Sequence, residues 1–330
     1  MKSNKRSSFI VVFIFLTLSV LLAACSSQGS NASTNPKEEN ELEKVNYAAF
    51  DGLNGMAVRF GAEKGFFEDE GIDVEFVVTK DEVASLTSGD VDFADANTTR
   101  IVVGGGKGAP IKIVGSMFRT KGPFYLIAKS DIKSVEDLKG KNVGVGIAGS
   151  GMDVYTRTIL AKHGLTEDDV HLINNGTYQQ AYATLETGQV DATLIHEPFV
   201  TLGETTGVAH LLAQGWKYLP EFHTGVLASN DKFIKEKPET LKKVLKAYLR
   251  SQEYAKANQD EYIDYVVKHV DIEPEVLKSA LDREEILWEN DLNIDVDRIE
   301  KSQDLQYELG FQEEKYDIKS LVNDKFIPKK

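Results

Sequence analysis

Cysteine is nearly absent from this sequence, since Cys25 is the only one among 330 residues. A chain with one cysteine cannot form an internal disulfide, so the fold must be stabilised by its core. Positive charge is also scarce, with 38 Lys and Arg against 52 Asp and Glu and a formal net charge of −14. Nucleic-acid binding requires basic side chains that neutralise phosphates, so this balance argues against a nucleic-acid partner.

Long apolar runs are missing from the sequence except at residues 9–23, which follow a basic start containing Lys2, Lys5 and Arg6. This run of about fifteen residues is shorter than the roughly 20 that a membrane-spanning helix needs and has the length of a signal peptide. We therefore expect residues 1–24 to be a signal peptide. Its removal would change the formal net charge from −14 to −17.

The end of the apolar run, Leu-Ala-Ala-Cys at residues 22–25, resembles a bacterial lipobox. In that motif the cysteine is lipidated and becomes the first residue of the mature protein. Residues 26–44 are rich in Ser, Asn, Glu and Lys and have no apolar periodicity, which predicts a flexible tether over residues 25–44. We expect an exported protein that is anchored through lipid on Cys25 to the outer face of the cytoplasmic membrane.

Short apolar segments alternate with segments of helical spacing from residue 45 onward. The strand-like segments are residues 45–50, 72–78, 91–96, 111–117, 124–128, 142–147, 170–173, 190–195 and 225–229. Such alternation predicts an α/β fold with mostly parallel sheet. From residue 232 onward the pattern is helical only.

A weak internal repeat relates residues 84–92 (ASLTSGDVD) to residues 183–191 (ATLETGQVD). Each copy has the pattern of a helix end, a glycine C-cap and a buried strand. The repeat indicates two lobes built to one plan, although chance similarity between two βαβ units is the alternative. Two such lobes would face each other across a cleft.

Residues 144–149 spell G-x-G-x-x-G, the pattern of a dinucleotide-binding turn. A dinucleotide site also needs an acidic residue at the end of the next strand, about 20 residues on, to bind ribose hydroxyls. Here that strand ends in Asn174 and Asn175. We therefore expect no nucleotide cofactor, and we interpret Gly149, Ser150 and Gly151 as a strand-to-helix turn whose free N–H groups bind a small anion.

No pattern in the sequence assembles a catalytic or metal site. Residues 104–108 (GGGKG) lack phosphate-loop spacing, and His196-Glu197-Pro198 lacks the second histidine of a zinc motif. The six histidines have no metal-ligand spacing, and no G-x-S-x-G elbow is present. We expect no metal and a binding protein that is not an enzyme.

Four segments together resemble one family of exported proteins. They are residues 62–75 (AEKGFFEDEGIDVE), 86–93 (LTSGDVDF), 132–144 (IKSVEDLKGKNVG) and 188–192 (GQVDA), the last followed by Glu197-Pro198. The match runs from about residue 45 to residue 260 and is similar to the substrate-binding proteins of ABC importers in the nitrate, sulfonate, taurine and thiamine-precursor group. As a set in this order the motifs are specific, although each alone is weak.

This resemblance implies a two-lobe fold of the periplasmic-binding-protein type (type II, the Venus flytrap) with two inter-lobe crossovers. Lobe 1 would comprise residues 45–120 and 223–330, and lobe 2 residues 121–222. The protein would act as a monomer that captures a small organic solute between the lobes and delivers it to a membrane permease, without a cofactor.

The ligand-binding residues are expected where strands end and helices begin. In the first lobe these are Asp51, Gly52, Asn54, Asn97 and Thr98, and in the second lobe Gly149, Ser150, Gly151, Tyr178, His196 and Glu197. Helix capping is the alternative interpretation for Asp51, Asn54, Asn97 and Thr98, and a first-turn helix position is the alternative for Glu197.

An aliphatic sulfonate or taurine-type anion is the first ligand expected from the resemblance. A thiamine-precursor pyrimidine or similar heterocycle is the alternative, because many relatives carry Trp near His196 and because a buried Glu197 would seek a hydrogen-bond donor. A pyrimidine-biosynthesis enzyme of the same fold is the alternative class. It would need histidine and cysteine near the cleft, and no cysteine follows Cys25.

Overall fold

The computed structural model describes residues 41–117, 122–284 and 291–329. Residues 40–330 form one compact unit. The predicted signal peptide, Cys25 and nearly all of the predicted tether therefore lie outside the described residues. None of the helices in the described ranges combines the length and hydrophobicity needed to cross a bilayer.

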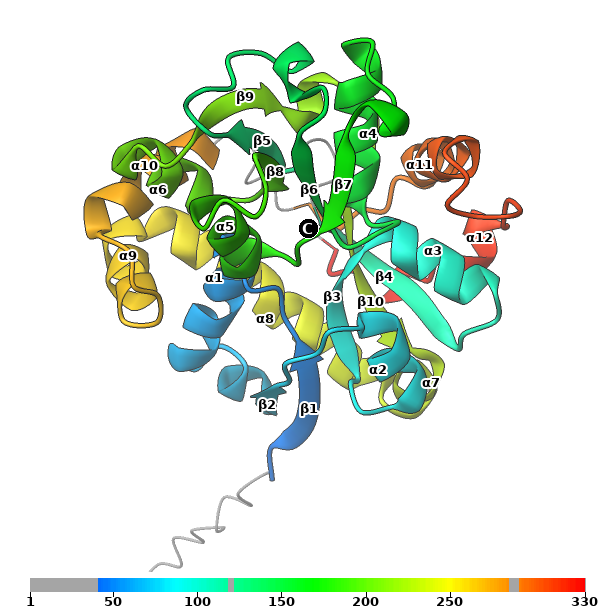
Figure 1. The fold of residues 1–330 in the computed structure, drawn as a ribbon. Helices are drawn as coiled ribbons and strands as arrows, with labels where there is room; N and C mark the ends of the chain where they lie inside the picture. Colours follow the sequence, from blue (N-terminus) through cyan, green and yellow to red (C-terminus); the bar gives the residue numbers. More distant parts are fainter. Residues whose placement is uncertain (1–40, 118–121, 285–290, 330) are drawn as a thin grey trace, which may run out of the picture. The chain divides into compact units, whose positions relative to one another are not determined.

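The first of two five-stranded sheets contains the N-terminal strands and one strand from much later in the chain (Figure 1). Its order is β2 (Ile72–Phe76), β1 (Glu43–Ala48), β3 (Phe93–Asn97), β10 (Gly225–Asn230) and β4 (Ile111–Met117). β1 pairs in parallel with β2 and β3, whereas β10 is antiparallel to both β3 and β4.

The second sheet repeats this arrangement with the middle of the chain. Its order is β7 (His171–Asn174), β6 (Asn142–Gly146), β8 (Ala192–Ile195), β5 (Tyr125–Ala128) and β9 (His210–Gln214). β6 pairs in parallel with β7 and β8, whereas β5 is antiparallel to β8 and β9.

The α/β class with two sheets is confirmed, but the expectation of mostly parallel sheet is wrong. Each sheet contains two parallel and two antiparallel pairs. The antiparallel pairs all involve β5 or β10, the strands that the chain forms immediately after it passes from one sheet to the other. β9 was not predicted, because its sequence HLLAQ lacks the β-branched and aromatic residues that favour strands.

The internal repeat has a structural counterpart in each sheet. Asp92 accepts a hydrogen bond from the N–H of Asn46 on β1, and Asp191 accepts one from the N–H of Asn142 on β6, both at 3.0 Å. The preceding glycines, Gly89 and Gly188, have φ of 82° and 79° at the ends of their helices. The two sheets are therefore built to one plan, as the repeat predicted.

Helices cover both sheets and make up most of the chain after β10 (Figure 1). Those between strands are α1 (Leu53–Glu63), α2 (Glu82–Ser88), α3 (Thr98–Gly106), α4 (Gly151–Lys162), α5 (Tyr178–Glu186) and α6 (Phe199–Thr206). Those after β10 are α7 (Asp231–Glu236), α8 (Pro238–Ala257), α9 (Gln259–Val267), α10 (Pro274–Glu284), α11 (Val296–Glu308) and α12 (Ile318–Leu321). The helical pattern predicted from residue 232 onward is confirmed in the described part of that region.

The long amphipathic helix α8 packs on the first sheet. Its apolar side chains, among them Leu241, Val244 and Leu245, are fully buried and join a core cluster with Val45 and Phe93 of that sheet. Burying such aliphatic side chains contributes about 1.5–3 kcal/mol each, which anchors the start of the C-terminal region.

The later C-terminal helices contact elements of both sheets. α10 packs against α6 of the second sheet. α11 packs against α3 of the first sheet, while its Leu305 and the following Leu309 join a core cluster of the second sheet. Figure 1 shows α11 beside both α3 and α4. The division into two lobes stays a prediction, and these helices do not belong to one sheet alone.

His223 connects the two chain segments that pass between the sheets. It is fully buried just before β10. Its Nδ1 lies 3.0 Å from Thr98 Oγ1 and its Nε2 lies 2.9 Å from Ser116 Oγ near the end of β4. The end of the return passage is thus tied to the end of β4, the strand that precedes the outward passage.

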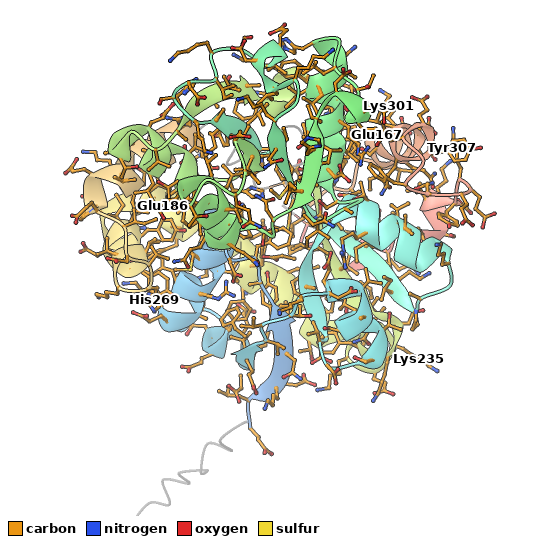
Figure 2. The ribbon with its side chains drawn as sticks, viewed as in Figure 1. Glu167, Glu186, Lys235, His269, Lys301 and Tyr307 are labelled. Carbon is orange, nitrogen blue, oxygen red and sulfur yellow. The ribbon has the colours of Figure 1, made fainter. Side chains whose placement is uncertain are left out.

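Charged side chains lie mainly on the outside of the fold. Figure 2 shows Glu186, Lys235 and Lys301 at the periphery of the ribbon, and all three are exposed. Many charged groups form surface ion pairs, such as Lys301 with Glu221 at 2.8 Å. Such exposed pairs contribute about 0–1 kcal/mol each, so the buried charges described below matter more to the site.

Candidate functional site

The candidate site lies where strands of the two sheets end and helices begin. β1 leads through residues 49–52 into α1, and β3 leads directly into α3. In the second sheet β6 leads through residues 147–150 into α4, and β8 leads through residues 196–198 into α6. In α/β sheets ligands bind at such carboxyl ends of strands, because helix N-termini offer free N–H groups there.

The glycine-rich turn after β6 is a strand-to-helix turn, as predicted. Gly149 has φ of 71°, a left-handed conformation that favours glycine. Its N–H donates to Asp153 Oδ2 at 2.9 Å, and the N–H of Ser150 donates to the carbonyl of Ile147 at 3.0 Å. Two of the three predicted socket donors are therefore engaged within the turn and its own helix.

Ser150 is the N-cap residue of α4, but its side chain makes no capping hydrogen bond. The residue is only 2% exposed, and its Oγ has no hydrogen-bond partner among the described residues. A buried hydroxyl without a partner costs free energy, of the order of 1–3 kcal/mol. Such a group at a helix N-terminus points to a ligand.

The third socket donor, the N–H of Gly151, is engaged by the opposite sheet. It donates to Asn97 Oδ1 at 3.3 Å. Asn97 is the N-cap residue of α3, yet its side chain does not cap that helix. The N-termini of α3 and α4 therefore meet, with the Asn97 carboxamide between them.

A second buried hydroxyl lies at the N-terminus of α3, beside the contact between Asn97 and Gly151. Thr99 is 2% exposed, and its Oγ1 has no hydrogen-bond partner in the described part of the chain. The predicted residue Thr98 is fully buried beside it, and its hydroxyl is engaged by His223.

The first two glycines of the G-x-G-x-x-G pattern contact Asn175, which fills the space beside Gly144 and accepts from the N–H of Gly146. A Cβ on Gly144 would lie 2.3 Å from Asn175 Nδ2, and Asn175 Oδ1 accepts the N–H of Gly146 at 2.9 Å. Asn175 Nδ2 also donates to Thr193 Oγ1 at 2.9 Å. The pattern thus serves the packing of a side chain from the next strand.

A small pocket lies near the Asn97–Gly151 contact, and its cavity volume of about 20 Å³ has room for about one water molecule. Its lining comes from both sheets and from α10, and comprises Phe50, Gly52, Leu53, Asn54, Pro123, Tyr178, His196, Glu197 and Glu284. Five residues predicted from the sequence are among them: Gly52, Asn54, Tyr178, His196 and Glu197.

Three rings connect the pocket to the α4 N-terminus. Tyr178 stacks on His196 with centroids 4.8 Å apart, and His196 lies 4.5 Å from the Phe124 ring. A Cβ on Gly151 would lie 3.7 Å from the same Phe124 ring. The α4 N-terminus and the pocket therefore belong to one continuous site.

Tyr178 reaches across the pocket toward the first sheet. Its φ of 49° is rare for a bulky residue, and such backbone strain is found mainly at functional positions. A Cβ on Gly52 would lie 2.6 Å from Tyr178 Cε1, so the absence of a side chain at residue 52 admits the ring. Burial raises the pKa of Tyr178, and the charges of Asp51, Asp95 and Glu284 raise it further.

His196 is uncharged in this environment. Burial lowers its pKa to about 4, and a hydrogen bond with the backbone of Pro123 opposes this change only in part. At neutral pH the His196 ring therefore offers an aromatic face and no positive charge for an anion.

Glu197 is a buried carboxylate that caps α6. It accepts from the N–H of Thr201 at 3.0 Å and from its Oγ1 at 2.9 Å, and it pairs with Arg283 Nε at 2.9 Å. The first-turn interpretation is wrong in position, because Glu197 precedes Pro198, the N-cap of α6, although its carboxylate accepts from the first turn. Glu197 lines the pocket as well. Burial raises its pKa, while Thr201 and Arg283 act in the opposite direction.

Asn54 and Asp51 flank the N-cap of α1, which is Gly52 without a side-chain cap. The capping interpretation of these two residues is therefore wrong. Asn54 Oδ1 accepts from Gln252 Nε2 of α8 at 2.6 Å, which orients its carboxamide in the pocket wall. Asp51 is exposed and lies 3.5 Å from Arg59, outside the lining.

The sequence did not indicate Pro123, Phe124, Glu284 or Gln306. Gln306 of α11 donates to the Gly149 carbonyl at 3.3 Å, so the C-terminal region holds the glycine turn in place. Pro123 and Phe124 follow the first passage of the chain between the sheets. The aromatic ring of Phe124 at that position was the one signal in the sequence that could have indicated these two residues. Glu284 and Gln306 lie in amphipathic helices in which many similar residues are exposed.

In the described ranges, no three His, Cys, Asp or Glu side chains are grouped so that they could hold a metal ion. The chemistry of the site is therefore that of two helix N-termini, two buried hydroxyls, an aromatic wall and two carboxylates.

The chain is similar in sequence to known binding proteins. A protein of Bacillus subtilis (strain 168) named for aliphatic sulfonate binding is 26% identical over 327 residues, which is 96% of each chain. The formylaminopyrimidine-binding protein of Halalkalibacterium halodurans is 25% identical over 283 residues, covering 82% of this chain and 80% of its own.

Among solved structures, the alkanesulfonate-binding protein SsuA of Xanthomonas axonopodis pv. citri has the same fold. It superposes with a TM-score of 0.73 at 17% identity, covering 86% of this chain and 98% of its own. The fold is therefore that of the periplasmic binding proteins. The family model described as NMT1/THI5 like matches residues 54–262. The chain belongs to the NMT1/THI5-like family.

Proposed function

We propose that this protein is the extracytoplasmic solute-binding component of an ABC importer and that it binds a small organic anion of the aliphatic sulfonate or taurine type. The ligand lies between the two sheets, and the liganded form delivers it to the permease. The names of the two sequence relatives, both binding proteins, support a role in binding without catalysis.

The observation that carries the anion proposal is the meeting of two helix N-termini at two buried hydroxyls that have no partner among the described residues. Ser150 Oγ at α4 and Thr99 Oγ1 at α3 are available to donate to an oxyanion, and both helix dipoles favour negative charge there. The chain has a strongly negative net charge and cannot attract an anion over long range. Such local donors therefore have to supply the affinity.

We assign the ligand site to the residues around this point and to the pocket beside it. They are Asp51, Gly52, Asn54, Asn97, Thr98, Gly149, Ser150, Gly151, Tyr178, His196 and Glu197, with Thr99, Phe124 and Glu284 added from the structure. Asp51 and Thr98 are the weakest of these assignments, because one side chain is exposed and the other is engaged by His223.

Binding works by closure in this proposal. Lobe 1 is built on the first sheet and lobe 2 on the second, and the hinge lies in the two passages between them. The ligand links the α3 and α4 N-termini, which lowers the free energy of the closed form that the permease recognises.

A planar heterocycle with amino groups is the second candidate ligand. The pocket lining favours it, because Glu197 and Glu284 supply carboxylates and the stacked Tyr178 and His196 supply a ring surface. A carboxylate buried in this way prefers an N–H donor to a sulfonate.

We further propose that the protein acts as a monomer and is exported and held at the membrane by lipid on Cys25, which lies outside the described residues. Cys25→Ser should release the protein from the membrane fraction of the producing cells. Membrane retention of Cys25→Ser equal to that of the wild type would contradict the anchor.

Calorimetric titration of the purified protein with ethanesulfonate, taurine, 4-amino-2-methylpyrimidine and NAD tests the ligand class. We expect a sulfonate to bind, and we expect Ser150→Ala to weaken it by about 1 kcal/mol, the contribution of one hydrogen bond. Ser279→Ala on the exposed face of α10 is the matched control and should leave binding unchanged. Binding of the pyrimidine alone would favour the second candidate, and binding of NAD would refute both.

A further inference from the structure

One hydrogen bond between the two sheets uses the Gly151 N–H, a donor that the proposed anion needs. Asn97 Oδ1 accepts from the N–H of Gly151, although the two residues are 54 positions apart in the chain. We propose that Asn97 is an internal competitor for the α4 N-terminus, so that a ligand oxygen must displace its carboxamide before it can bind. The inference rests on the proposed function, because it concerns the same site.

Asn97 does not perform the helix-capping role that is expected of an asparagine at its position. An asparagine at the N-cap normally accepts from an N–H two or three residues further along its own helix. Asn97 has an extended N-cap backbone with φ of −68° and ψ of 125°, but its side chain makes no such bond in α3. The carboxamide is instead committed to the helix of the other sheet, where it takes the position of a ligand oxygen.

The contact is weak enough to be displaced. Its N···O distance of 3.3 Å is longer than the usual 2.7–3.2 Å, and both groups are uncharged before binding. An oxyanion would form shorter, charge-assisted bonds of about 2.7–2.9 Å to the same N–H. It could also accept from Ser150 Oγ and Thr99 Oγ1, which the neutral carboxamide leaves without partners in the described residues.

The competition sets the affinity of the site. The apparent affinity of every ligand that uses the Gly151 N–H is multiplied by the fraction of molecules in which the Asn97 carboxamide has left that N–H. This cost is the same for each such ligand, so Asn97 does not change their relative affinities. A weak neutral acceptor would gain little over the carboxamide, whereas an anion gains two further hydroxyl donors and would bind despite the cost.

Three variants test this inference. Asn97→Ala removes the competitor, Asn97→Asp keeps its shape but adds a negative charge at the two helix N-termini, and Asn46→Ala is the matched control. Asn46 lies on β1 of the same sheet, and its side chain donates to the carbonyl of Asp90, away from the pocket lining. Circular dichroism melting checks that each variant is folded.

We expect Asn97→Ala to bind ethanesulfonate and inorganic sulfate about three- to tenfold more tightly, the effect of removing one competing hydrogen bond. Asn97→Asp should bind both at least about tenfold more weakly, because its carboxylate holds Gly151 by a charge-assisted bond. Asn46→Ala should match the wild type. Weaker binding by Asn97→Ala would overturn the inference, because it would make Asn97 a ligand contact.

A second measurement needs no ligand. Hydrogen exchange of the Gly151 amide, followed by NMR, should be several-fold faster in Asn97→Ala and unchanged in Asn46→Ala. If the wild type binds neither probe, the proposed anion function fails, and the exchange rate still decides whether Asn97 occupies Gly151. Unchanged exchange in Asn97→Ala would overturn the inference whatever the ligand proves to be.

Discussion

Asp95 offers the sharpest test of the electrostatics near the site. It lies in β3, two residues before Asn97, and is only 2% exposed. Its carboxylate accepts from the hydroxyl of Tyr47 at 2.5 Å and from the N–H of Phe50, a pocket residue, at 3.0 Å. Burial nevertheless dominates and raises the pKa of Asp95 from its ordinary value of 3.8 to about 6.

The sign of the effect on stability follows from this direction. Between about pH 4 and pH 6 the folded protein retains a proton on Asp95 that the unfolded chain has lost, so the free energy of unfolding falls as pH rises. A change from 3.8 to about 6 corresponds to about 3 kcal/mol, which is lost in full above pH 6.

Asp95→Asn removes the charge and keeps the shape. The carboxamide oxygen can still accept from Phe50, and its amino group can donate to the Tyr47 hydroxyl. We expect the variant to be more stable than the wild type at pH 7, by up to about 3 kcal/mol less any cost of the altered hydrogen bonds. The difference should shrink toward zero as pH falls to about 4.

Urea unfolding of both proteins at several pH values between about 4 and 7 measures this difference. Asp73→Asn on the exposed side of β2 is the matched control for loss of a carboxylate. The reasoning is refuted if the difference between Asp95→Asn and wild type is the same at both ends of the pH range, or if the variant is less stable at pH 7 than at pH 4 relative to wild type.

Three further predictions concern the pocket and its ligand. Gly52→Ala should weaken ligand binding about tenfold, because its Cβ would meet Tyr178 Cε1 at 2.6 Å, and calorimetry should show no further effect of the change in a Tyr178→Ala background. Arg283→Ala should lower the free energy of unfolding by roughly 2–4 kcal/mol, since it leaves the buried Glu197 without its cation, and Glu197→Gln in the same protein should restore part of the loss. Equal costs of Arg283→Ala in both backgrounds, measured by urea unfolding, would contradict that mechanism. A ligand at a hundredfold excess over its Kd should stabilise the protein by about 2.7 kcal/mol, and a ligand that binds without raising the melting temperature would contradict binding to the folded state alone.

Local patterns in the sequence were sufficient for most of the elements. The strand segments and the turn at Gly149 depend on side-chain alternation and on a positive φ, which are properties of neighbouring residues. The repeat that ends in Asp92 and Asp191 also predicted the common plan of the two sheets. Strand direction was not predictable in the same way, because it depends on which distant strand lies alongside.

The residues of the candidate site likewise divide into those that the sequence predicted and those that it did not. Gly52, Tyr178, His196 and Glu197 could be named because they follow strands, and the ends of neighbouring strands converge. Glu284 could not be named from the sequence, because it lies in a C-terminal helix whose glutamates look alike there. Only the packing of α10 on α6 places it in the pocket lining.

The sequence by itself determined the α/β class, the two-part plan and the positions at which helices begin beside strand ends, because each follows from local periodicity and backbone preference. Only the tertiary structure decided what those positions contact. Gly151 and Asn97, 54 residues apart, meet because two sheets bring two helix N-termini together. The meeting of the helix N-termini also buries Ser150, whose hydroxyl has no hydrogen-bond partner among the described residues. A hydrogen bond between distant residues leaves no periodicity in a sequence, so the chemistry of this site is a property of the folded chain.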